Sequence, residues 1–131
     1  MAEIAYLDSS AIVKTVIDEP ESHALRTFLR AFPTRASAEL ARAEVVRAVR
    51  RAELGALPRA YEALDRLLLV GVRRGLLEAA GLLDPPELRT LDAVHLAAAR
   101  TLAPELAVLI TYDARMQGAA SVLGLPVEAP Q

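Results

Sequence analysis

Short apolar runs alternate with longer amphipathic segments along the whole chain. The clearest runs are IAYLD at 4–8 and LAVLITYD at 106–113, and each ends in an aspartate. Such runs are typical of strands that are buried on both faces of a parallel sheet. Shorter runs at 34–37 and 125–129 predict two further strands. Between the strands the pattern predicts helices, at 9–17, 22–31, 38–54, 58–71, 90–102 and 114–124.

Start and stop signals support most of these boundaries. A serine after Asp8 is expected to cap the first helix, Gly55 to follow the end of the helix at 38–54, and Pro58 to begin the next one. The stretch 71–83 is ambiguous and allows a short strand followed by a short helix, and DPPEL at 84–88 is a loop. Strands that alternate with helices predict an α/β sandwich around a mostly parallel sheet.

Composition narrows the class of protein without naming a function. The 131 residues, 53% of them apolar, are expected to form a single domain over 1–131. The absence of cysteine excludes disulfides and thiolate metal sites. No signal peptide and no apolar run of about 18 residues is found, so we expect a soluble, cytoplasmic protein that does not enter a membrane.

The charge of the chain is informative only locally. The net charge of −2 gives no general attraction to nucleic acid. Arg47, Arg50 and Arg51, however, lie close together on one face of the helix at 38–54, where they are candidates for contact with RNA phosphates. The alternatives are a solvated stripe or a docking site for an acidic or C-terminal segment of a partner.

Asp92 is the most unusual acid in the chain. The helix that carries it is apolar on all sides and is therefore expected to be buried, and a buried carboxylate needs a partner. With Thr90 as N-cap, Asp92 would benefit from the helix dipole, but this does not explain its apolar surroundings. No lysine or arginine lies within TLDAVHLAAA. His95, one turn later, is expected to be a packed core residue, and it could also pair with Asp92.

Three other acids occupy positions from which they could reach Asp92. Asp8 and Asp113 follow strands whose carboxyl ends share one edge of the sheet, where ligands of parallel α/β sheets bind. Either aspartate could instead simply cap the helix that follows. Glu44 lies on the apolar side of its helix, although pairing with Arg47 is an equal alternative.

Carboxylates that converge in this way repel one another unless a cation neutralises them. Ligation by oxygen alone selects Mg²⁺ or Mn²⁺. The sequence therefore predicts that the partner of Asp92 is a divalent ion.

Four stretches in order, YLDSSAIVK, SAELARAEVVRAVRR, LRTLDAVHLAAA and LITYDARMQGAASVLGLPV, resemble the four acidic motifs of the PIN domain, in particular those of VapC-like ribonuclease toxins. The resemblance spans residues 5–127 and implies a three-layer α/β/α sandwich. It also implies an acidic pocket with metal ligation by Asp8, Asp92 and Asp113, most firmly by the first two. The other pocket residues that it implies are the acid Glu44 and the supporting hydroxyls of Ser9 or Ser10 and of Thr111.

The same resemblance implies the function. A VapC-like protein would be a Mg²⁺- or Mn²⁺-dependent endoribonuclease, a homodimer, and the toxin partner of a cognate antitoxin whose C-terminal part blocks the pocket. The alternative is a PIN-fold module that acts through protein binding without significant nuclease activity. A receiver domain would need adjacent acids after the first strand, where LDSS has one, and a dehalogenase-type phosphatase would need a second aspartate where Ser10 stands.

Overall fold

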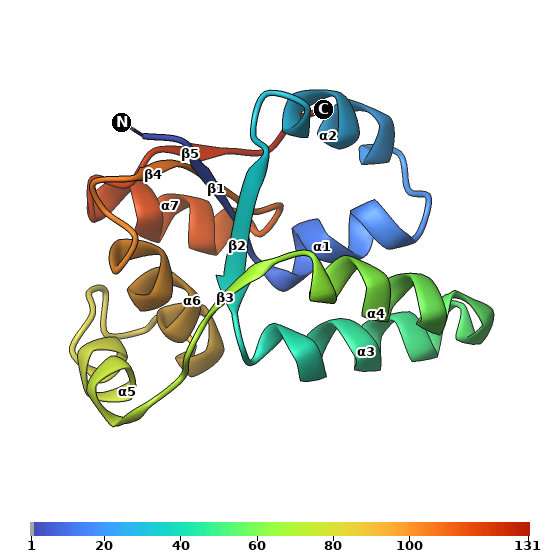
Figure 1. The fold of residues 1–131 in the computed structure, drawn as a ribbon. Helices are drawn as coiled ribbons and strands as arrows, with labels where there is room; N and C mark the ends of the chain where they lie inside the picture. The colour runs from blue at the N-terminus through green and yellow to red at the C-terminus, as the bar shows by residue number, and fades with distance from the viewer. Residues whose placement is uncertain (1) are drawn as a thin grey trace.

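A sheet of five parallel strands lies at the centre of the molecule, in the order β3-β2-β1-β4-β5 (Figure 1). The computed structural model describes residues 2–131. Its strands are β1 (Ile4–Leu7), β2 (Thr34–Ala38), β3 (Leu68–Val70), β4 (Leu106–Ile110) and β5 (Val127–Glu128). Because β1 is paired on both sides, its residues have no exposed edge, in agreement with the unbroken apolar run that predicted it.

Helices cover both faces of this sheet (Figure 1). One face carries α1 (Ser9–Val16), α2 (Ser22–Leu29), α3 (Ala41–Ala52), the short 3₁₀ turn η1 (Leu54–Ala56) and α4 (Leu57–Asp65). The other carries α5 (Arg74–Gly81), α6 (Thr90–Arg100) and α7 (Ala114–Val122). Along β1, Ala5 and Leu7 pack against the first layer and Tyr6 against the second. The predicted three-layer α/β/α sandwich is confirmed.

Helix α6 is enclosed almost completely. All seven residues from Ala93 to Ala99 are buried, so the prediction of a helix without a polar face is confirmed. Small side chains at 98 and 99 allow its backbone to approach the sheet closely, and Leu96 packs in the same cluster as Tyr6. Only the two ends of the helix reach the surface, and Asp92 lies at the first of them.

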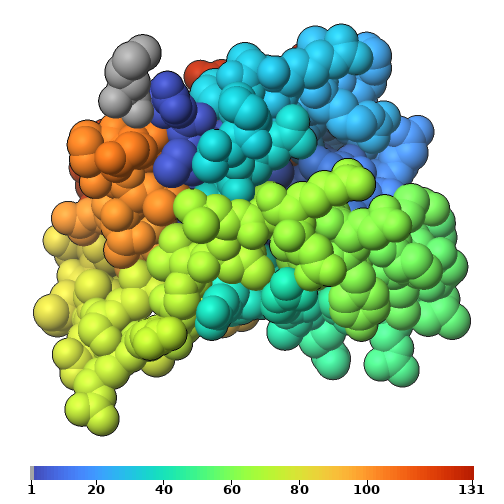
Figure 2. All heavy atoms as spheres, viewed as in Figure 1, coloured from blue at the N-terminus to red at the C-terminus, as the bar shows by residue number. Residues whose placement is uncertain are grey.

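The largest error of prediction concerns the helix expected at 58–71. This helix, α4, ends at Asp65, and Leu68–Val70 form the edge strand β3 beside β2. The apolar run at 68–70 is compatible with either a helix or a strand, and these residues form a strand because they pair with β2. Figure 2 shows the yellow-green segment around β3 lying across the front of the molecule, and Leu68 there is 51% exposed.

Smaller differences concern helix starts. The helix expected from residue 38 begins at Ala41, because β2 continues through Ala38. The N-cap of α1 is Asp8 rather than a serine, and the N-cap position of α6 is Arg89 rather than Thr90. In the ambiguous stretch 71–83 only the helix is found, as α5. Within the described residues, no helix combines the length and the apolar character needed to cross a bilayer.

The C-terminus of α7 depends on a glycine. Gly124 has a φ of +74°, and the amides of Gly124 and Leu125 bond back to the carbonyls of Ser121 and Ala120, which is the Schellman arrangement. We expect Gly124→Ala to lower the free energy of unfolding by about 1–2 kcal/mol, because a Cβ is strained at this φ. The control is Gly118→Ala, where an added Cβ has no neighbour within 4 Å, and which should stabilise α7 by about 0.5–1 kcal/mol. Urea unfolding of both variants measures the difference, and equal effects would contradict this explanation.

Candidate active site

Asp8 lies at the carboxyl end of β1, the end toward which the arrowhead of β2 points in Figure 1. Its side chain is only 4% exposed. One carboxylate oxygen accepts hydrogen bonds from the Ser10 hydroxyl at 2.7 Å and the Ala11 amide at 3.0 Å, and the other accepts from the Thr111 hydroxyl at 2.6 Å. Burial raises the pKa of Asp8 even though all three donors lower it. Asp8 is therefore rigidly held, and its negative charge is poorly solvated.

Asp113 follows β4, the strand next to β1, and caps α7. Its Oδ1 accepts from the amides of Arg115 and Met116 at 2.8 and 3.2 Å. Thr111 joins the two strand ends, because its hydroxyl donates to Asp8 and also accepts from the Asp113 amide at 3.1 Å. Both aspartates thus act as helix caps, and the same backbone geometry brings them to one edge of the sheet.

Asp92 lies in the first turn of α6 and is partly buried. Among residues 2–131 it forms no ion pair, and it accepts no hydrogen bond, whereas each of the other three acids of the predicted pocket accepts at least one. Burial raises its pKa, and the charge of Asp113 raises it further, with a smaller contribution from Asp8. His95 and Arg89 lower the pKa without reversing the shift. Asp92 is therefore near the other two aspartates and has no protein cation in contact with it.

Glu44, on α3, has different partners from those the sequence suggested. Its Oε1 accepts from the Ser9 hydroxyl at 2.5 Å and lies 2.8 Å from Nε2 of His95. The alternative pairing with Arg47 is not found among the described residues, and the suggested pairing of His95 with Asp92 is wrong. The two serines after β1 have separate partners, because Ser9 bonds to Glu44 and Ser10 to Asp8.

The sequence matches the family model of the PIN domain over residues 5–121. The chain belongs to the PIN domain family. Similar characterised sequences include three proteins of Mycobacterium tuberculosis. Ribonuclease VapC46 is 52% identical, Ribonuclease VapC35 is 42% identical and Ribonuclease VapC47 is 36% identical. Each match covers 95% of this chain and 96% of the relative, so this PIN domain is VapC-like over nearly its whole length.

A solved structure agrees with the PIN fold. The crystal structure of VapBC2 from Rickettsia felis, bound to a DNA fragment from its promoter, contains a chain that superposes with a TM-score of 0.70. The match covers 98% of this chain and 99% of that one, at 16% sequence identity. At this identity the similarity concerns the fold alone.

The donors of this PIN domain suit a hard cation, although they do not form a closed cage. Within residues 2–131, no three acidic or imidazole side chains lie close enough together to hold a metal ion as they stand. Mg²⁺ commonly retains several waters and is bound through one or two carboxylates. Among the residues that the structure describes, Asp92 accepts no hydrogen bond, and only Oδ1 of Asp113 accepts the amides that cap α7, so Oδ2 of Asp113 is not used in capping. Both side chains can therefore offer carboxylate oxygens of this kind. The residues therefore fit a hydrated Mg²⁺ or Mn²⁺.

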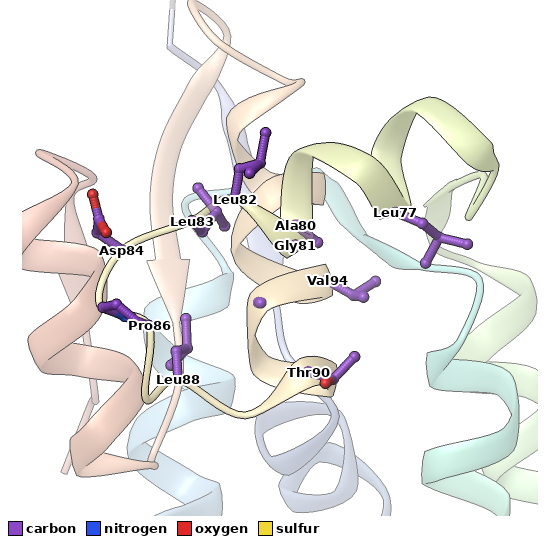
Figure 3. Close-up of a pocket in the computed structure, with 11 residues that line it drawn as sticks. Leu77, Ala80, Gly81, Leu82, Leu83, Asp84, Pro86, Leu88, Thr90 and Val94 are labelled. Carbon is purple, nitrogen blue, oxygen red and sulfur yellow. The ribbon is translucent and has the colours of Figure 1, made fainter.

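Two cavities of the PIN domain lie next to α6. Asp92 lines a hollow of about 410 Å³ with Leu88, Ala114 and Val122. A second cavity, of about 400 Å³, lies between α5, α6 and the intervening loop, and Figure 3 shows Leu77 and Val94 at its sides. None of the four acids lines this second cavity.

The three arginines of α3 form a separate feature of the surface. Arg47, Arg50 and Arg51 are exposed and together line a hollow of about 290 Å³. None of them forms an ion pair within the described part of the chain, so their charges are available to an external anion.

Proposed function

We propose that this PIN domain, acting as one domain over 1–131, is an endoribonuclease that hydrolyses RNA with the help of Mg²⁺ or Mn²⁺. The observation that carries the proposal is that Asp8, Asp92 and Asp113 lie near one another at one edge of the sheet. Burial raises the pKa of Asp8 and of Asp92, and the charges of Asp113 and Asp8 raise the pKa of Asp92 further. Burial and neighbouring negative charges raise the free energy of ionised carboxylates, and a bound dication lowers it by neutralising their charge. The relatives named ribonucleases support the choice of reaction.

Each acid has a part in this proposal. Asp8 and Asp92 would hold the principal ion, and Asp113 and Glu44 would complete the pocket directly or through water. The bound dication would supply a hydroxide for attack on the phosphodiester and would offset negative charge in the transition state. Ser10 and Thr111 fix the orientation of Asp8, because their hydroxyls donate to different carboxylate oxygens. Rigid ligands reduce the reorganisation required during the reaction.

The biological role we propose is that of the toxin in a toxin–antitoxin pair. The names of the VapC relatives and of the VapBC2 complex support a cognate antitoxin as partner. We further propose that the C-terminal part of this antitoxin covers the acidic pocket. We also propose a homodimer. If the protein acted only by binding a partner, RNA cleavage would not depend on the acids, and the cleavage assay with Asp92→Asn separates the two possibilities.

The test of the reaction is cleavage of labelled single-stranded RNA by EDTA-treated protein. We expect no cleavage in EDTA, cleavage after addition of Mg²⁺ or Mn²⁺, and none by Asp92→Asn under any condition. Asp84→Asn is the matched control, because Asp84 is exposed and lies outside the pocket. Cleavage in EDTA, or equal cleavage by wild type and Asp92→Asn, would refute a metal-dependent ribonuclease at this site.

The arginines of α3 give a prediction about RNA binding. Replacing Arg47, Arg50 and Arg51 together with alanine should raise the Kd for single-stranded RNA about 10-fold at low salt, since each exposed pair contributes up to about 1 kcal/mol. The slope of log Kd against log salt should decrease by about 0.7 for each phosphate that the variant no longer binds. Fluorescence anisotropy measures both quantities, and the control is Arg30→Ala, at the exposed residue that follows α2. If both the affinity and the salt slope were unchanged, the three arginines would not contact RNA and would instead be solvated or bind a protein partner.

A further inference from the structure

His95 is the centre of a buried polar chain that joins the core of the sheet to the acidic pocket. It is 2% exposed, and its Nδ1 lies 2.7 Å from the hydroxyl of Tyr6 on β1. Its Nε2 lies 2.8 Å from Oε1 of Glu44 on α3 and 3.4 Å from the Ser9 hydroxyl. The rings of Tyr6 and His95 pack edge to face, with an angle of 78° between their planes. Three layers of the sandwich are therefore connected through one imidazole.

The donors in this chain can be assigned from the acceptors around them. Burial raises the pKa of Tyr6 well above its usual value, so the phenol keeps its proton and must place it on an acceptor. Ser37 lies near enough to lower that pKa somewhat, but its buried hydroxyl has no hydrogen bond of normal geometry in the described residues. The acceptor in reach is Nδ1 of His95. With Nδ1 as the acceptor, the N–H that faces Glu44 is the one on Nε2.

This arrangement restrains Glu44. A glutamate side chain has several rotatable bonds, and holding it in one conformation costs conformational entropy. Here the Ser9 hydroxyl and the His95 N–H both donate to Oε1 of Glu44, so the carboxylate is fixed at one oxygen while the other remains available. A buried histidine needs a partner for each ring nitrogen, and here these partners are the Tyr6 hydroxyl and the Glu44 carboxylate.

We infer that His95 is a positioning residue for Glu44, set in the Nε2–H tautomer by Tyr6, so that the fourth acid of the pocket is held in place by a hydrogen bond from the protein core. The effect on RNA cleavage rests on the proposed function. The tautomer itself does not, and the two can be measured separately.

The first experiment is long-range ¹H–¹⁵N correlation NMR of the full chain at neutral pH. The chain contains two histidines, and the exposed His23 on α2 is assigned by His23→Phe. We expect His95 to be a single Nε2–H tautomer in the wild type, and Tyr6→Phe to change the ¹⁵N chemical shift of Nδ1, because this nitrogen then loses its hydrogen-bond donor. An Nδ1–H tautomer in the wild type, or an unchanged His95 spectrum in Tyr6→Phe, would overturn the inference.

The second experiment is a double-mutant cycle with His95→Phe and Glu44→Ala, followed by kcat and KM for RNA cleavage. We expect His95→Phe to lower kcat about 10–100-fold with KM nearly unchanged, which is the usual loss for a group that orients a site residue. In the Glu44→Ala background the same change should cost less than about two-fold. His95→Gln, which keeps an N–H donor, should recover part of the activity. Equal losses in both backgrounds would overturn the inference.

Controls keep the outcomes distinct. His23→Phe should leave kcat unchanged, and thermal unfolding of every variant identifies losses caused by misfolding. If His95→Phe does not fold, His95→Gln and Tyr6→Phe replace it in the cycle and are judged by the same criterion. If the wild type cleaves no RNA, the proposed function fails, and the NMR measurement still decides whether Tyr6 sets the tautomer of His95.

Discussion

Replacement of Asp8 by asparagine is expected to lower kcat for RNA cleavage by at least about 100-fold without unfolding the protein. Residues that merely orient a metal ligand cost about 10–100-fold when they are changed, so loss of a principal ligand should cost no less. Asparagine keeps one oxygen to accept from Ser10 and Ala11, and its amide can donate to the Thr111 hydroxyl, which then accepts. The fold should therefore tolerate the change.

The measurement is single-turnover cleavage at saturating protein, with circular dichroism as a check on the fold. Asp84→Asn serves again as a control for the loss of one charge. If Asp8→Asn kept an activity within about three-fold of the wild type, Asp8 would not be a principal metal ligand, whatever the result for the other acids.

A second large effect is expected in the pH dependence of stability without divalent ions. Folding raises the pKa of Asp8 above its usual value of about 3.9, so between these two pKa values the folded state binds more protons than the unfolded state. The contribution of Asp8 to stability is therefore fully present below pH 3.9 and is lost as the pH rises through the folded-state pKa. The loss amounts to about 1.4 kcal/mol for each unit by which folding raises the pKa.

Urea unfolding in EDTA from pH 4 to pH 7 measures this effect. The free energy of unfolding of Asp8→Asn, relative to the wild type, should increase with pH, and Mg²⁺ should reverse the difference at pH 7 by stabilising the wild type alone. Asp92→Asn should behave in the same direction with a smaller amplitude, because solvent screens its partly exposed carboxylate. If the difference in the free energy of unfolding between Asp8→Asn and the wild type were constant with pH, or decreased as the pH rises, folding would not raise the pKa of Asp8.

The parts of the fold that were predicted correctly are those in which local pattern and tertiary structure require the same residues. The run at 4–8 had to be a central strand, because an apolar stretch without alternation is buried on both faces. The residues of β3 have no local pattern that requires a strand. They follow α4 after only two residues, and their strand conformation comes from the neighbouring edge of β2, which no local pattern contains.

The acids divide in a similar way. Asp8 and Asp113 could be placed together because parallel strands end at one edge of a sheet, which is a property of the fold class. The partners of Glu44 could not be predicted, since His95 lies 51 positions away and meets it only because α3 and α6 approach the same strand end from opposite layers. Tyr6 gave no polar signal either, since a tyrosine within a buried strand is typical of core packing.

The central claim is that carboxylates from separate elements form one site whose repulsion is relieved by a bound dication. Isothermal titration of the EDTA-treated wild type and of Asp92→Asn with Mn²⁺ at neutral pH tests it most directly. We expect saturable binding of Mn²⁺ to the wild type, and we expect this binding to be lost or weakened at least about 10-fold in Asp92→Asn. Equal affinity of the two proteins for Mn²⁺, or no binding to the wild type in the presence or absence of RNA, would contradict it.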